Sequence, residues 1–164
     1  MFGLSETDLM YKEYIKELSK YDPNIAKIDD LDVLHTVSLY KRQSETDWID
    51  IYYNEKIVGF LIVSTNKYEK RSIEDRAICQ LYVVPQYRRH GLAKDAVITY
   101  LKSHPGIYSY DISDGNNVAS NFWYKVLKDI NAKYTELPEK RSLQESQYLS
   151  LNGMVVGEKC ACAS

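Results

Sequence analysis

Long apolar runs, an excess of positive charge and a secretory leader are all missing from this sequence of 164 residues. No stretch of about 18 apolar residues occurs, and the N-terminus lacks both the basic start and the apolar core of a signal peptide. We therefore expect a cytoplasmic protein without a membrane partner. The 21 basic and 23 acidic residues leave a net charge of −2, which gives no general field to hold nucleic acid. Any anion site is expected to be local.

Cysteine is scarce, and its spacing excludes two common uses. Cys79, Cys160 and Cys162 form neither an even-numbered disulfide framework nor a CxxC motif, so we expect reduced thiols. Cys79 falls in the middle of an expected strand and is interpreted as a small buried hydrophobe. His35 and His104 have no partners at ligand spacing, and no metal site is expected.

Glycine is also scarce where nucleotide-binding loops need it. Only Gly91 lies between residues 60 and 105, and the sequence contains neither GxxxxGK[ST] nor GxGxxG. These absences disfavour both ATP and NAD as ligands.

The residues that are present predict one soluble globular domain over 1–164. Hydrophobic residues make up 45% and charged residues 27%, which is ordinary for a folded domain of this length. A helix is predicted over 5–20, with a Ser5 cap and an apolar face at Leu9, Tyr11, Ile15 and Leu18. The stretch 25–43 fits a helix or a strand. We favour the strand, because it puts Val33, His35, Val37 and Leu39 on one side.

Three adjacent strands are predicted next, followed by a βαβ unit. The strands cover 47–53, 57–65 and 77–84, with a hairpin link at 54–56 and Pro85 ending the third. A helix that begins after Gly91 and a strand over 107–113 should complete a parallel βαβ unit. A second amphipathic helix follows with Ala119, Phe122, Trp123, Val126 and Ile130, and two short strands, 133–137 and 146–151, close the domain.

The segment "VVPQYRRHGLAKDA", residues 83–96, predicts an anion site at the junction of a strand and a helix. A helix N-terminus exposes unpaired amides and a partial positive charge, so it grips phosphate through the backbone. Gly91 allows close approach, and Arg88 and Arg89 add charge that suits a diphosphate.

The extended segment "LYVVPQYRRHGLAKDA" resembles the acetyl-CoA signature of the GCN5-related N-acetyltransferases (GNAT family). In that signature a strand ending in Val-x-Pro precedes (Gln/Arg)-x-x-Gly-x-(Gly/Ala), and Arg88, Gly91 and Ala93 fill its three defining places. The block "NNVASNFWYKV" is similar to the family's Asn-x-x-Ala-x-x-Phe-Tyr-x-Lys. It is matched by Asn116, Ala119, Phe122, Trp123 and Lys125. The resemblance covers about residues 47–151 and does not extend clearly to the first 45.

The resemblance implies an α/β fold with a mixed, mostly antiparallel sheet flanked by helices. The sheet should splay open between the parallel strands 77–84 and 107–113 and admit the pantetheine arm of acetyl-CoA, the acyl donor. Leu81 and Val83 would offer main-chain groups to the acetyl and pantetheine parts, and Asn116 or Asn117 would touch the arm from the other side. The amides that would receive the pyrophosphate belong to Arg88, Arg89, His90, Gly91, Leu92, Ala93 and Lys94.

Acetyl transfer to an amine needs a base for the amine and a proton for the leaving thiolate. Asp75, or Glu74 beside it, is the candidate base by its match to an acid of histone-acetylating family members. The family's acid is a tyrosine, whose place falls on Trp123 in the Phe-x-x-Lys frame and on Tyr124 if the register runs from Asn117. An indole cannot serve as this acid, and our hypothesis is Tyr124.

The expected function is N-acetyltransfer from acetyl-CoA to a primary amine of a small molecule or protein, by direct attack in a ternary complex. The alternative is a GNAT-fold module that holds CoA without turnover and acts as a sensor or interaction domain. A weaker alternative is the use of another acyl-CoA. A monomer or homodimer is expected, with no nucleic-acid partner and no metal cofactor.

Overall fold

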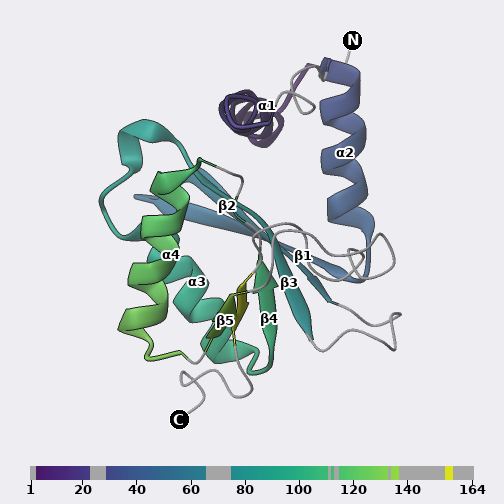
Figure 1. Cartoon of the computed structure of the whole chain (residues 1–164). Helices are drawn as coiled ribbons and strands as arrows, with labels where there is room; N and C mark the ends of the chain where they lie inside the picture. Colours follow the sequence, from purple (N-terminus) through teal and green to yellow (C-terminus); the bar gives the residue numbers. More distant parts are fainter. Residues whose placement is uncertain are drawn as a thin grey trace.

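A mixed β-sheet separates two pairs of helices (Figure 1). The computed structural model describes residues 3–22, 29–65, 75–110, 112, 115–132, 134–136 and 154–156. Within these ranges the helices are α1 (Glu6–Leu18), α2 (Asp30–Arg42), α3 (Leu92–Ser103) and α4 (Asn117–Asp129), with a 3₁₀ turn, η2 (Pro85–Tyr87). The strands are β1 (Thr46–Tyr53), β2 (Lys56–Thr65), β3 (Arg76–Val83), β4 (Tyr108–Tyr110), β5 (Tyr134–Glu136) and β6 (Met154–Val156).

The sheet has the order β1-β2-β3-β4-β6-β5, and the β3–β4 pair is parallel while the other pairs are antiparallel. This arrangement confirms the predicted mixed sheet and the predicted βαβ unit. β4 is shorter than the predicted strand over 107–113. Its assigned residues are those that pair with β3 on one side and β6 on the other. β5 confirms the prediction over 133–137, whereas the strand predicted over 146–151 lies outside the described residues.

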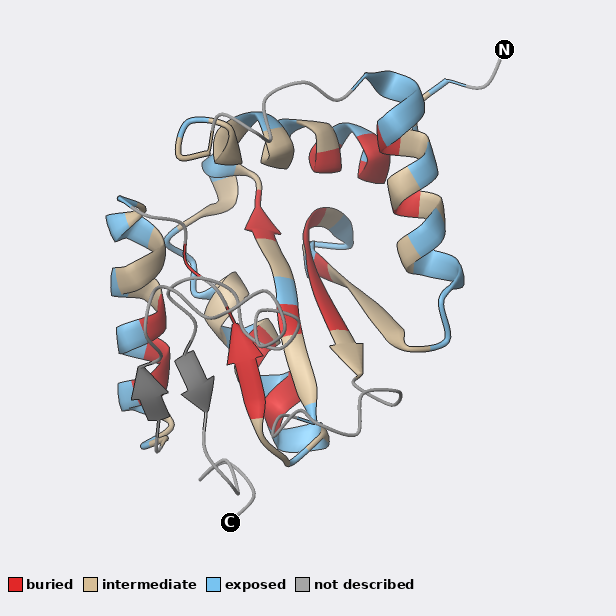
Figure 2. Cartoon of the chain, turned by 45° about the vertical axis from the view of Figure 1, so that its right-hand side comes forward, coloured by how far each residue is buried: buried red, intermediate tan, exposed pale blue. Residues whose placement is uncertain are grey.

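The first three strands form the predicted meander. Asn54 and Glu55 connect β1 to β2 with φ of 47° and 66°, a pair of left-handed residues that suits a tight two-residue hairpin. β2 is the central strand of this meander and is buried on both faces. Phe60 and Ile62 pack toward α1 and α2, while Leu61 and Val63 pack toward α3 and α4. This double burial explains the continuous apolar run (Figure 2).

Helix α1 confirms the first prediction. Ser5 caps it through a reciprocal capping box with Asp8. The buried face differs slightly from the expected one: Met10 and Tyr11 are buried, whereas Leu9 is 50% exposed.

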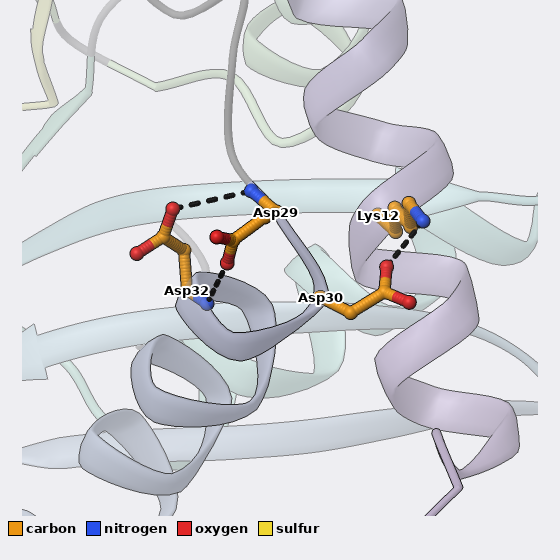
Figure 3. A network of polar contacts seen from close by, with 4 residues as sticks. All are labelled: Lys12, Asp29, Asp30 and Asp32. Carbon is orange, nitrogen blue, oxygen red and sulfur yellow. Dashed lines mark hydrogen bonds and ion pairs between the residues drawn. The ribbon is translucent and has the colours of Figure 1, made fainter.

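The strand favoured over 25–43 is wrong, because its described part forms α2. Asp29 caps this helix through a capping box with Asp32, as Figure 3 shows, and Lys12 of α1 forms an ion pair with Asp30. The residues that point into the core are Val33 and Val37, which are 0% and 3% exposed. Their spacing of four is helical, so tertiary packing and the acidic cap outweigh the β-branched composition.

None of the helices in the described part of the chain is long and apolar enough to span a bilayer.

Candidate active site

β3 and β4 separate in the middle of the sheet. Their pairing starts at Arg76 opposite Tyr108 and stops at Ile78 opposite Tyr110, although β3 continues to Val83. Beyond Ile78, the edge of β3 that faces β4 has no strand partner among the described residues. An open edge of this kind offers main-chain donors and acceptors to an extended ligand.

The backbone of Leu81 and Val83 points toward this open edge. The Val84 amide donates to Val58 O at 2.8 Å, so it faces β2. Because successive residues of a strand direct their peptide groups to opposite sides, the groups of Val83 and Leu81 face away from β2. A bulge precedes them, since Ile62 and Val63 of β2 oppose Gln80 and Ile78 and leave Cys79 as the extra residue.

The end of β3 leads through η2 to the N-terminus of α3. Gly91 is the N-cap of α3 and has φ of 75°, and Arg89 is left-handed as well, with φ of 65°. The amides of residues 92–94 lie in the first turn and have no intrahelical acceptor. The amides of residues 89–91 make no backbone hydrogen bond with another described residue. Six consecutive amides are thus available at the positive end of a helix, which is the geometry of an anion site.

Arg88 is used differently from its neighbours. Its amide donates to Pro85 O at 3.2 Å and is therefore already bonded. Its guanidinium donates to both carboxylate oxygens of Glu17 in α1, at 3.0 and 2.7 Å, and to Val83 O at 2.7 Å. Partial burial by itself lowers the pKa of Arg88, but the bonds and charge of Glu17 outweigh it, and the pKa is raised. The charge expected to face a diphosphate is instead paired with α1.

Two further side chains of the predicted cofactor set hold the backbone in place. His90 Nδ1 lies 3.1 Å from Tyr87 O and 3.0 Å from Arg88 O, so a protonated Nδ1 can donate to these two carbonyl acceptors. Lys94 Nζ forms an ion pair with Asp129 Oδ2 of α4 at 2.9 Å, which raises the pKa of Lys94. Leu92 and Ala93 pack with Val83 and Val58 in a small apolar cluster, so apolar contacts with β2 and β3 hold the start of α3 in place.

Asn116 and Asn117 begin α4. Asn116 is the N-cap, and its Oδ1 accepts the Ala119 amide at 3.1 Å. This bond leaves the Nδ2 amide hydrogens of Asn116 to donate elsewhere. Asn117 is exposed in the first turn. Contact of either asparagine with the pantetheine arm stays a prediction.

Asp75 directly precedes β3, and its side chain is exposed. Its Oδ2 accepts the Ile107 amide at 2.8 Å, and its own amide donates back to Ile107 O at 2.8 Å. The carboxylate thereby joins β3 to the segment that enters β4. Cys79 at the opening lies four positions further along the chain, a span of about 13 Å in extended chain. Glu74 lies outside the described residues.

Trp123 and Tyr124 are neighbours on α4 but differ in burial. Trp123 is buried, and its ring stacks on that of Tyr110 with centroids 4.0 Å apart. Tyr124 is 43% exposed. The frame of Phe122 and Lys125 therefore places the family's tyrosine position in the core, where its occupant is an indole. Of these two neighbouring aromatic residues, Tyr124 is the exposed one.

A polar cluster on the α1–α2 face of β3 was missed from sequence. Gln80 Nε2 lies 3.3 Å from both Tyr11 Oη and Tyr40 Oη. Burial raises the pKa of both tyrosines, that of Tyr40 to about 12, so their hydroxyls are neutral at physiological pH and act as hydrogen-bonding groups rather than bases. The helical spacing of Tyr11 gave no hint of Gln80, because these residues meet only through tertiary packing.

Cys79 was expected to be buried, and this is wrong. It is exposed at the bulge, with Sγ 3.4 Å from Ser64 Oγ. A bulged residue is forced out of the regular alternation, which explains why the periodicity misplaced it. Among the described residues no group of three or more His, Cys, Asp or Glu side chains is arranged to hold a metal ion.

Comparison with known proteins gives a family and a fold. The model of the "Acetyltransferase (GNAT) family" matches residues 8–127. The match begins well inside the N-terminal 45 residues, where the sequence showed no clear resemblance. No curated protein matches the sequence.

Solved structures of similar fold cover nearly the whole chain. An acetyltransferase from Thermus thermophilus has 11% identity and a TM-score of 0.63, covering 93% of this chain and 91% of its own. Tetrahymena GCN5 has 12% identity and a TM-score of 0.55, with coverages of 94% and 88%. The diaminobutyrate acetyltransferase EctA from Paenibacillus lautus, in complex with L-2,4-diaminobutyric acid and coenzyme A, has 15% identity and a TM-score of 0.57, with coverages of 92% and 89%.

Proposed function

The chain belongs to the GNAT family of acetyl-CoA-dependent N-acetyltransferases, and on this premise we propose that it transfers the acetyl group of acetyl-CoA to a primary amine of a small molecule or protein. The amine attacks directly within a ternary complex. One observation carries the proposal: the edge of β3 that opens after Ile78 is followed, through the η2 turn, by the free amides that lead into α3. We propose that residues 1–164 act as one domain.

The residues at the opening fit acetyl-CoA. Leu81 and Val83 present main-chain groups along the open edge for the pantetheine amides, and Val83 does so through its N–H because its carbonyl already accepts Arg88 Nε. The amides of residues 89–94 receive the diphosphate, as the positive end of α3 favours. Nδ2 of Asn116, or the side chain of Asn117, contacts the arm from the α4 side. Bound acetyl-CoA supplies the activated acetyl group.

Proton transfer is assigned to two side chains. Asp75 acts as base through water, because its Oδ2 is bonded to the Ile107 amide and Oδ1 is the oxygen left to take a proton. Glu74 is the alternative base. Tyr124 supplies the proton for the leaving thiolate, since its neighbour Trp123 carries no acidic hydroxyl and is fixed in the core.

A catalytically weak or inactive CoA-binding module is the second candidate. It is favoured by the same stack of Trp123 on Tyr110, which removes the family's tyrosine from its usual place, and by the structural bond that Asp75 already makes. Such a module would bind CoA and act as a sensor or an interaction domain.

Measurement of thiol release separates these candidates. The chain is incubated with acetyl-CoA and a panel of primary amines, including diamines, polyamines, aminoglycosides and lysine peptides, and free CoA is followed spectrophotometrically. Direct transfer predicts amine-dependent release and initial-velocity lines that intersect when both substrates are varied. Calorimetric binding of acetyl-CoA without amine-dependent release supports the module. Absence of both binding and release refutes both candidates.

A further inference from the structure

Glu17 is an acid in the last turn of α1. A negative charge at this end of a helix is opposed by the helix dipole, so the position needs a compensating cation. Arg88 provides it, with Nη1 3.0 Å from Oε1 and Nη2 2.7 Å from Oε2. Two parallel bonds between a guanidinium and a carboxylate fix both distance and orientation.

The same guanidinium is anchored to β3. Its Nε donates to Val83 O at 2.7 Å, and its Cζ lies over the ring of Tyr82, 5.4 Å from the centroid. Arg88 is therefore held by three elements at once, namely α1, the end of β3 and the η2 turn that its own amide caps. Its charge is neutralised within the protein, so it is not offered to a ligand.

Apolar packing joins α1 to the first residue of this loop, because Val84 packs against a cluster that contains Met10 and Tyr11 of α1. A groove of about 590 Å³ lies between the helix and the loop, lined by Glu13, Glu17, Tyr82, Gln86 and Tyr87 among others. Among the described residues, the side-chain hydrogen bonds that join α1 to the loop 84–91 all come from Arg88. After Val84, this ion pair is thus the side-chain link that holds the loop to α1; its two side chains are 37% and 36% exposed, and Arg88 lies one residue before the first free amide.

We propose that Glu17 is a positioning residue for acetyl-CoA, which acts by holding Arg88 and thereby fixing the free amides of residues 89–94 in register with the open edge of β3. The proposal rests on the proposed function. It gives α1, which carries no part of the acetyl-CoA signature, a role in binding the diphosphate. A loop fixed beforehand loses less conformational entropy when the ligand binds, so the pair should lower the KM for acetyl-CoA.

Glu17→Gln is the central variant, because it keeps the shape of the side chain and removes its charge. Glu13→Gln is the matched control: it lies one turn earlier on α1, is exposed, and lines the same groove without contacting Arg88. Each variant and the parent are tested for the KM of acetyl-CoA, for kcat with a saturating amine, and for amide hydrogen exchange of peptides covering residues 84–95 in the free protein.

We expect Glu17→Gln to raise the KM for acetyl-CoA about three- to tenfold, to leave kcat within about twofold, and to speed exchange in the 84–95 peptides. Glu17→Asp, which restores the charge, should recover part of the KM. Arg88→Ala should raise the KM at least as much, and adding Glu17→Gln to it should have little further effect, because both remove one interaction. Glu13→Gln should match the parent.

Three results would overturn the proposal, and they show whether the proposed function falls with it. A parent-like KM and parent-like exchange in Glu17→Gln, with the parent active, refute the role of Glu17 and leave the proposed function intact. A lower melting temperature with an unchanged KM does the same, since it indicates a purely structural pair. A parent that neither binds nor consumes acetyl-CoA removes the proposed function and this role together, even if exchange in the loop responds to Glu17→Gln.

Discussion

The indole ring of Trp123 lies almost parallel to the phenol ring of Tyr110, with centroids 4.0 Å apart and planes inclined by 19°. Tyr110 is the last residue of β4 that pairs with β3, and Trp123 projects from α4 into the core. The stack therefore lies where the two strands separate. Because the indole of Trp123 is held in this stack, the search for a proton donor moves to the next residue of the helix.

Replacement of Tyr124 by phenylalanine tests the proton donor. The change removes only the hydroxyl and keeps the ring of a residue that is 43% exposed, so kcat is compared together with the melting temperature and the acetyl-CoA affinity of both proteins. We expect kcat to fall about tenfold or more, because general acid catalysis contributes on the order of 10²–10⁴ in rate. Tyr52→Phe, on an exposed tyrosine of β1, is the control. Turnover by Tyr124→Phe equal to the parent's removes Tyr124 from the mechanism.

Replacement of Gly91 by glutamate tests the diphosphate site. The glutamate adds a negative charge beside the free amides, and it must also adopt the left-handed φ of 75° found at this position. Calorimetry at fixed salt should show the acetyl-CoA Kd rising by about thirtyfold or more, since several charge-assisted bonds of ~1.5–3 kcal/mol are disturbed together. Gly91→Asn tolerates the backbone and adds no charge, and it should bind within about threefold of the parent. Undiminished affinity in Gly91→Glu contradicts the site.

Much of the sheet and of the binding loop was predictable from local pattern. The strand-forming residues of β1, the apolar run of β2, and Pro85 after β3 are each signals that act within a few residues of the element they define. Gly91 likewise indicates its own backbone conformation, because glycine enters the left-handed region more readily than any residue with a Cβ.

The features that escaped prediction depend on partners distant in sequence or on competing local signals. Val33 and Val37 fit a strand by composition and a helix by spacing, and the reciprocal bonds of Asp29 and Asp32 decide for the helix. The bond between Glu17 and Arg88 joins residues 71 positions apart, and neither residue has a local pattern that indicates the other.

Asp75→Asn separates catalysis from structure at the β3–β4 junction. The asparagine Oδ1 can still accept the Ile107 amide, so the melting temperature should change little, while the ability to take a proton is lost. With the proposed role, kcat falls about tenfold or more at constant acetyl-CoA affinity. Asp50→Asn on β1, whose Oδ1 accepts from Trp48 Nε1 at 2.9 Å, is the matched control. A parent-like kcat in Asp75→Asn assigns the carboxylate to the junction alone and directs attention to Glu74.

The partly buried Tyr40, on the α1–α2 side of the sheet, should make the free energy of unfolding depend on pH in the alkaline range. Burial, assisted by the nearby Tyr11 and Cys79, raises the pKa of Tyr40 from 10.0 to about 12 in the folded chain. Below pH 10 both the folded and unfolded states keep the proton, and the stabilising contribution is complete. Between pH 10 and about 12 only the unfolded state releases it, so the free energy of unfolding falls as pH rises.

Urea unfolding at about pH 8, 10 and 11 measures how the free energy of unfolding changes with pH. Tyr40→Phe should make this free energy fall less steeply above about pH 10, because the variant removes one group that releases a proton in the unfolded state. Tyr52→Phe, on an exposed tyrosine, should leave the slope as in the parent. An equal slope in Tyr40→Phe and the parent contradicts the raised pKa. A reduced slope also indicates that the Gln80 amide faces a neutral Tyr40 hydroxyl at and below about pH 10, so the role of this hydroxyl is to hold Gln80 beside the bulge of β3.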